Sequence, residues 1–341
     1  MQATPGVRMR RRIMVVAGLA AALSLMLTGS LLADGGKGKK SSKKRNTIAL
    51  PADAVAAYPE GIAVKGNWIY TGSSQDGTIF RARRGNTTAR AISSAGAGGR
   101  TAALGMTFDK NDHLLVAGGA TGKVFVLDRF GTPLGSFTKP TGAYNPASPT
   151  FLNDITVARN GDVYVTDSFS AVIYRISAAA LAAPMPSGLL EEWLLLAGSP
   201  ITYGPGFNLN GIVAKKNRYL LVVQTNTGKL FRISIATKAI TEVTVKGTTL
   251  TGGDGMVLHD ERLYVVHAGV VDVLKLKNTF RSARLRATIT DPSFDSPTTA
   301  ALHKGRLYVV NSQFGKLFAN PVVPPTLPFT ISVVKPNSGK H

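Results

Sequence analysis

The sequence predicts an all-β fold, a six-bladed β-propeller. The first observation is a hairpin pattern in residues 153–168, where apolar residues alternate with polar ones on both sides of Asn160-Gly161, a dipeptide that favours hairpin turns. The second is that this pattern occurs six times. Measured at positions 61, 105, 154, 211, 255 and 299, the steps are 44, 49, 57, 44 and 44 residues. Propeller blades repeat every 40–50 residues, roughly.

Each repeat has a lead residue, a small second residue, a strand, a turn and another strand. The first and second strands are expected at residues 60–64 and 68–72, 104–108 and 113–117, 153–157 and 163–167, 210–214 and 219–223, 254–258 and 262–266, and 298–302 and 306–310. Third strands are expected at 78–81, 122–126, 172–176, 228–233 and 315–318, and weaker fourth strands at 134–138, 240–245 and 285–289. A single domain over residues 46–341 follows from the unbroken period.

The ends of the repeat region predict how the ring closes. Residues 329–334 favour a last strand, which we expect to share a blade with residues 46–50. Residues 139–149, rich in Pro, Gly and Ser, and residues 178–186, where the third repeat lengthens, are expected to be surface loops.

The N-terminus is typical of an export signal. Residues 1–33 combine four arginines, an apolar stretch from Ile13 to Leu27 and small residues before Asp34, which predicts a cleaved signal peptide and a secreted or periplasmic protein. The alternative is an uncleaved membrane anchor, because residues 13–32 are long enough to span a bilayer. The chain has no cysteine. This excludes disulfides, thiol catalysis and a lipid-attached cysteine.

Positive charge continues after the predicted signal. Residues 34–45 form a basic low-complexity linker that we expect to be disordered. Residues 1–45 contain ten Lys or Arg and one Asp, so the rest of the chain keeps +12 of the total +21. The sequence argues against nucleic acid as a partner, since it shows neither a recognition helix nor a basic motif flanked by aromatic residues. A basic surface that attracts an anionic envelope polymer is the alternative, and we expect a monomer.

Short motifs within the repeats resemble those of a known family. They are Pro59-Glu60-Gly61, Asn153-Asp154 with Tyr-Val-Thr-Asp-Ser at 164–168, Asn210-Gly211-Ile212, and Gly253-Asp254-Gly255-Met256. On these residues the chain resembles, over roughly residues 50–335, the senescence marker protein (regucalcin), gluconolactonase and luciferin-regenerating enzyme family of six-bladed propellers. NHL-repeat and strictosidine synthase-like propellers have similar short sequence motifs.

The lead residues are the candidate site. In a propeller the first strand of each blade lines the central channel, so the residue before it projects toward the axis at one mouth. These residues are Glu60, Leu104, Asn153, Asn210, Asp254 and Thr298. Two carboxylates and two amides make an oxygen-only cluster, which suits Ca²⁺ or Mg²⁺ rather than zinc.

The resemblance implies roles for four of them: Glu60, Asn210 and Asp254 as metal ligands, and Asn153 as the residue that contacts substrate. Sugar-acid binders of the family carry an arginine where this chain has Phe151, which argues against an aldonolactone substrate. An alternative explains the lead dipeptides as turn residues that a blade needs wherever it begins. Asp154 could equally cap a local turn.

Other residue types offer no competing site. The histidines at 113, 259, 267, 303 and 341 show no metal-ligand spacing and are interpreted as surface residues, and Ser168 lacks a nucleophile-elbow context. Two function classes remain. One is an exported metal-dependent hydrolase of lactones or related esters, with Asp254 and Asn153 as its catalytic residues. The other is a non-enzymatic propeller that binds a small ligand or an anionic envelope polymer.

Overall fold

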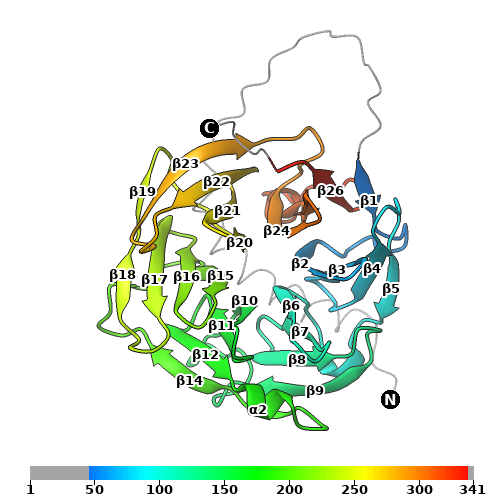
Figure 1. Cartoon of the computed structure of the whole chain (residues 1–341). Coiled ribbons are helices and arrows are strands. Elements are labelled where there is room, and N and C mark those ends of the chain that lie inside the picture. Colours follow the sequence, from blue (N-terminus) through cyan, green and yellow to red (C-terminus); the bar gives the residue numbers. More distant parts are fainter. Residues whose placement is uncertain (1–45, 337–341) are drawn as a thin grey trace.

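A computed structural model describes residues 46–336. The predicted signal peptide, the basic linker and the 13–32 anchor alternative lie outside the described residues. Six β-sheets are arranged around a central axis (Figure 1), which confirms the predicted all-β six-bladed propeller. No helix within residues 46–336 has the length and apolar character needed to cross a membrane.

Blades 1 to 3 follow the predicted order of strands from the axis outward. Blade 1 contains β2 (Pro59–Lys65), β3 (Trp68–Ser73), β4 (Ile79–Arg83) and β5 (Arg90–Ser93). Blade 2 contains β6 (Met106–Phe108), β7 (Leu114–Ala117), β8 (Lys123–Leu127) and β9 (Pro133–Thr138). Blade 3 contains β10 (Leu152–Val157), β11 (Val163–Asp167), β12 (Val172–Ile176) and β14 (Glu191–Leu195).

Blades 4 to 6 repeat this plan, and the last one closes the ring. Blade 4 contains β15 (Leu209–Lys215), β16 (Tyr219–Gln224), β17 (Lys229–Ser234) and β18 (Ile240–Glu242). Blade 5 contains β20 (Met256–His259), β21 (Arg262–His267), β22 (Val270–Leu276) and β23 (Ser282–Ile289). Blade 6 contains β24 (Pro297–His303), β25 (Arg306–Asn311), β26 (Thr330–Val334) and, outermost, β1 (Thr47–Ala49).

The ring closes as predicted, because the N-terminal β1 pairs antiparallel with the C-terminal β26. The prediction of a strand at residues 315–318 is wrong. These residues belong to a short helix, α3 (Phe314–Leu317), and β26 supplies the third strand. In blade 4 the chain reverses on Gly228, at φ 67°, directly before the third strand, whereas in blade 6 the left-handed residue is Gln313, two positions before the corresponding glycine. The reversal therefore comes too early to start a strand there.

Two short strands join neighbouring blades. β13 (Gly188–Leu189) leaves the blade 3 segment and pairs parallel with β9 of blade 2. β19 (Thr244–Lys246) leaves blade 4 and pairs parallel with β23 of blade 5. The predicted strand at 240–245 is thus split between two blades. The predicted loop at 178–186 contains a helical turn, α2 (Ala178–Leu181), capped by Ser177.

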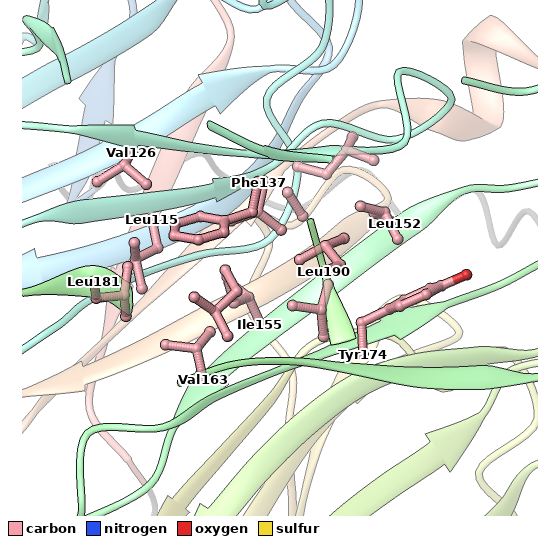
Figure 2. Close-up of a cluster of buried hydrophobic side chains, with 14 residues drawn as sticks. Leu115, Val126, Phe137, Leu152, Ile155, Val163, Tyr174, Leu181 and Leu190 are labelled. Atoms are coloured by element: carbon pink, nitrogen blue, oxygen red, sulfur yellow. The ribbon is translucent and has the colours of Figure 1, made fainter. Parts of the chain in front are cut away.

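The hydrophobic core lies between the blades, with one apolar cluster at each of the six interfaces. At the interface of blades 2 and 3, Phe137 and Leu115 pack against Ile155 and Val163 (Figure 2). A fully buried side chain of this kind stabilises the fold by roughly 1.5–3 kcal/mol. Since the polar lead residues lie at the axis, the apolar packing holds them in place from outside.

Candidate functional site

The innermost strands β2, β6, β10, β15, β20 and β24 surround the axis (Figure 1), each against its two neighbours. Four of them carry the lead residue inside a β-bulge. In β2, for example, Pro59 pairs with Ser73 and Ile62 with Thr71, so one extra residue lies between the two pairs. β10, β15 and β24 shift register in the same way. A bulge turns a side chain away from the regular alternation of the strand.

Four of the lead residues are followed by a glycine that the neighbouring blade approaches closely. A Cβ on Gly61 would lie 2.0 Å from the Leu104 carbonyl oxygen, and one on Gly211 would lie 2.2 Å from that of Asp254. Neither glycine has a positive φ. Glu60-Gly61 and Asn210-Gly211 therefore lie within strands and not in turns. Glycine is required here by the backbone of the next blade, and this requirement leaves the choice of lead residue free.

Three predicted metal ligands each have an oxygen without a partner. Glu60 Oε2, Asn210 Oδ1 and Asp254 Oδ1 are buried and accept no hydrogen bond. Only eight side-chain atoms of residues 46–336 are in this condition. An unpaired buried polar atom costs about 1–3 kcal/mol, and an absent ion or water is one explanation. A hard cation that accepts all three oxygens fits this donor set.

Burial and neighbouring carboxylates raise the pKa of two acids at the axis, Glu60 and Asp254. Burial, followed by the charges of Asp254 and Asp154, raises the pKa of Glu60 well above its ordinary value, although a hydrogen bond from Thr299 opposes this. Burial and the charge of Asp154 raise the pKa of Asp254 to about 8, against hydrogen bonds from Asn210 and the Gly255 N–H. These acids therefore favour their protonated forms, and a divalent cation beside them would favour ionisation.

Asp154 performs both roles that the sequence left open. Its carboxylate accepts the N–H of Ile155 at 2.8 Å, as a local cap, and the N–H of Ile212 in blade 4 at 3.0 Å. It also acts electrostatically on Glu60 and Asp254. Burial raises the pKa of Asp154 to about 6, although the two N–H donors oppose the shift. Asp154 joins blades 3 and 4 beside the candidate metal ligands.

Asn153 is buried and oriented by Ser168. Its Nδ2 donates to Ser168 Oγ at 3.0 Å, and this hydroxyl donates to the Leu209 carbonyl of blade 4 at 2.7 Å. Because the nitrogen of the amide is engaged, Oδ1 is the atom that can contact a substrate or cation. Ser168 is thus a positioning residue and not a nucleophile.

Aromatic residues next to the lead motifs were missed by the sequence reasoning. Phe151 lies 5.1 Å from Phe207 and 5.5 Å from Phe169, centroid to centroid, and Phe169 lies 5.0 Å from Phe207. Phe151 also lies with Leu104 against Gly119. The three phenylalanines directly flank the motifs at 153, 168 and 210. The position of these phenylalanines beside the motifs could have indicated a role at the site, but only the fold shows that their rings contact one another.

One interpretation of the histidines is wrong. His267 is 7% exposed, and its Nε2 lies 3.0 Å from Asp272 Oδ2. Asp272 also accepts the hydroxyls of Thr248 and Thr288, each at 2.6 Å. His267 ends the second strand of its blade, where Asp167, Gln224 and Asn311 are also buried in theirs. No group of three or more His, Cys, Asp or Glu within residues 46–336 is placed to hold a metal by itself, so the candidate set depends on its amide.

Comparisons with known proteins support the fold. No family model matches the chain, and no curated protein does. Among solved structures, the allergen Mala s 1 of Malassezia sympodialis superposes with a TM-score of 0.63 at 14% identity, covering 87% of this chain and 97% of that one. Virginiamycin B lyase of Staphylococcus aureus follows with a TM-score of 0.55 at 16% identity, covering 79% and 82%.

A streptogramin B lyase is similar to the same extent, with a TM-score of 0.53 at 14% identity, covering 85% of this chain and 97% of that one. At such identities the likeness is one of fold alone. Membership of the regucalcin and gluconolactonase family is not shown by these comparisons and stays a prediction. The chain is a six-bladed β-propeller whose fold resembles those of virginiamycin B lyase and Mala s 1.

Proposed function

We propose that the protein is a divalent-metal-dependent hydrolase of lactones or related esters. Glu60, Asn210 and Asp254 would hold the cation, Ca²⁺ or Mg²⁺. The observation that carries the proposal is the coincidence of these three residues with three unpartnered buried oxygens at the axis. The ligands come from three separate blades, so the closed ring keeps them at fixed separations.

The chemistry follows from the charges of the site. A bound divalent cation supplies a Lewis acid that polarises a substrate carbonyl. Asp254 accepts a proton from water as the water oxygen bonds to the carbonyl carbon, and it returns this proton to the leaving alkoxide as the ester C–O bond breaks. The pKa of Asp254, about 8 without a cation, falls when positive charge is added beside it. Asn153, held by Ser168, orients the substrate through Oδ1.

The aromatic residues support an apolar substrate. Phe151, Phe169 and Phe207 form one cluster, and Phe151 stands where the sugar-acid binders of the resembled family carry an arginine. A phenylalanine cannot pair with a carboxylate, whereas it packs well against an alkyl or aryl group. We therefore favour alkyl or aryl lactones and esters over aldonolactones.

The experiment measures cation binding and hydrolysis together. Calorimetric titration with Ca²⁺ and Mg²⁺ is combined with a panel of lactones and arylesters, with and without chelator. Asn210→Ala should weaken cation binding at least tenfold and lower turnover. Asn226→Ala is the matched control, because Asn226 also has an unpartnered buried oxygen but is not a lead residue. If the wild-type protein binds no divalent cation at millimolar concentration, the hydrolase proposal fails and the non-enzymatic alternative replaces it.

A further inference from the structure

One row of residues across blade 5 is basic on every strand. In the observed register, His259 of β20 pairs with Arg262 of β21, and Arg262 pairs with Lys275 of β22. Lys275 pairs with Arg284 of β23, and Arg284 pairs with Lys246 of β19. Partners in register point to the same face of a sheet. These five residues, which we call the basic row, span five strands and thus about 19 Å.

The basic row is accessible, and acids compensate it at its inner end only. Lys246, Lys275 and Arg284 are exposed, while their neighbours along the strands point into the core. Lys275 pairs with Glu261 at 2.7 Å, and His259 lies 3.7 Å from Asp260. Within residues 46–336, Arg262, Arg284 and Lys246 have no ion-pair partner. The outer half of the row, at the rim of the ring in Figure 1, is uncompensated.

Such a row does not stabilise the fold. Like charges directly opposite each other in a sheet are destabilising. Here three successive pairs join two positive side chains, and the fourth joins His259 to Arg262. Arg286, the residue skipped where β22 and β23 shift register, adds another exposed cation on β23. The arrangement becomes favourable when a negatively charged chain lies across the strands. A cleft of about 550 Å³ lies at the inner end of the row, where His259, Arg262, Lys275 and Lys215 line it together with the acids Asp260 and Glu261.

We infer that the basic row binds a linear anionic glycan, a polysaccharide that carries carboxylate or phosphate groups along its length. The row is linear and open, so it matches a chain of charges better than a single small anion. No aromatic side chain is exposed in the row, and aromatic stacking is what single-stranded nucleic acid uses at such sites. This inference does not depend on the proposed hydrolase, since none of the five residues is a lead residue.

The test uses the full-length protein and polygalacturonate as the probe. Binding is measured by affinity electrophoresis at several salt concentrations for the double variant Lys246→Gln, Arg284→Gln. The control is Lys110→Gln, Arg159→Gln, which removes the same charge from exposed hairpin turns of blades 2 and 3. We expect at least a tenfold loss of affinity and a shallower salt dependence for the first variant, and less than a twofold loss for the control.

Melting temperature separates binding from a structural role. The double variant in the row should melt at or above the wild-type temperature, because it removes repulsion. Equal losses for both double variants would overturn the inference, since binding would then follow total charge. Tighter row-dependent binding to single-stranded DNA or to phosphatidylglycerol vesicles than to the glycan would overturn the choice of partner. Lactone hydrolysis by the row variant should equal that of the wild type, so the two proposals can fail separately.

Discussion

Replacing Asp254 by Asn should stabilise the cation-free protein at alkaline pH. Burial and the charge of Asp154 raise the folded-state pKa of Asp254 to about 8. Its carboxyl therefore favours the protonated form in the folded protein. The stability that this provides is fully present below the unfolded pKa of about 3.9 and is lost as the pH rises through 8. Asparagine has a similar shape and does not titrate, so the variant avoids the loss.

The size of the effect follows from the shift. One pKa unit corresponds to about 1.4 kcal/mol, so the wild type loses about 4 kcal/mol relative to the variant between pH 5 and pH 8. Oδ1 is fully buried but the residue as a whole is partly exposed, so solvent screens part of the charge that the two oxygens share, and about 4 kcal/mol is the upper value. For a domain of this size the loss corresponds to about 8 °C in melting temperature.

Calorimetry in chelator at pH 5 and pH 8 measures this difference. The control is Asp260→Asn, whose side chain is 89% exposed and lies in the same blade. Saturating Ca²⁺ should raise the melting temperature of the wild type at pH 8 and should raise that of Asp254→Asn much less. At 100 times the dissociation constant, binding adds about 2.7 kcal/mol to the free energy of unfolding of the wild type. If the wild type and Asp254→Asn differ equally at pH 5 and pH 8, the carboxyl is not buried as described and the reasoning is refuted.

Three further predictions concern blade packing, closure and specificity. Gly211→Ala should lower the free energy of unfolding by roughly 1–3 kcal/mol, because its Cβ would overlap the Asp254 carbonyl. Gly204→Ala, whose Cβ has its nearest contact at 3.4 Å, should change this free energy little, and urea titration of both variants measures the difference. Deletion of residues 329–334 should lower the melting temperature far more than a loss of six surface residues, since it opens the ring at β1 and β25; an unchanged melt would place closure elsewhere. Phe151→Arg should lower kcat/KM for aryl esters at least tenfold and improve that for anionic lactones, and an unchanged ratio of the two would remove Phe151 from the substrate site.

The fold was predictable from the sequence because each blade repeats one pattern. The alternation of Ile155 and Val157 determines a strand without reference to the rest of the chain, and the step between units determines the number of blades. The predicted strand at residues 315–318 failed where one backbone angle differs. Gln313 takes the left-handed conformation, and the helix Phe314–Leu317 follows it although residues 315–318 resemble third strands of other blades. Sequence similarity between repeats does not report this angle.

The lead residues could be singled out from the sequence, whereas the contacts around them could not. Glu60, Asn210 and Asp254 were singled out because each begins a repeat, and in the structure each has one buried oxygen without a hydrogen-bond partner. The contacts of Asp154 with Ile212 and of Ser168 with Leu209 join blades 3 and 4 and cross 58 and 41 residues. Such contacts depend on the angle between neighbouring blades, and a repeat pattern does not fix this angle.

The packing around the axis explains why folding and chemistry occupy adjacent positions. At the second position of four units the next blade is so close that Gly61, Gly105, Gly211 and Gly255 have no room for a side chain. In β2 and β15 one bulge contains both this glycine and the lead residue before it. Packing thus constrains one residue of each pair and leaves the other free to vary. Leu104 and Thr298 show that the ring accepts apolar and hydroxyl side chains there. The buried acids at the other lead positions lower the stability of the cation-free fold, and ligation of a cation is the interaction that would offset this cost.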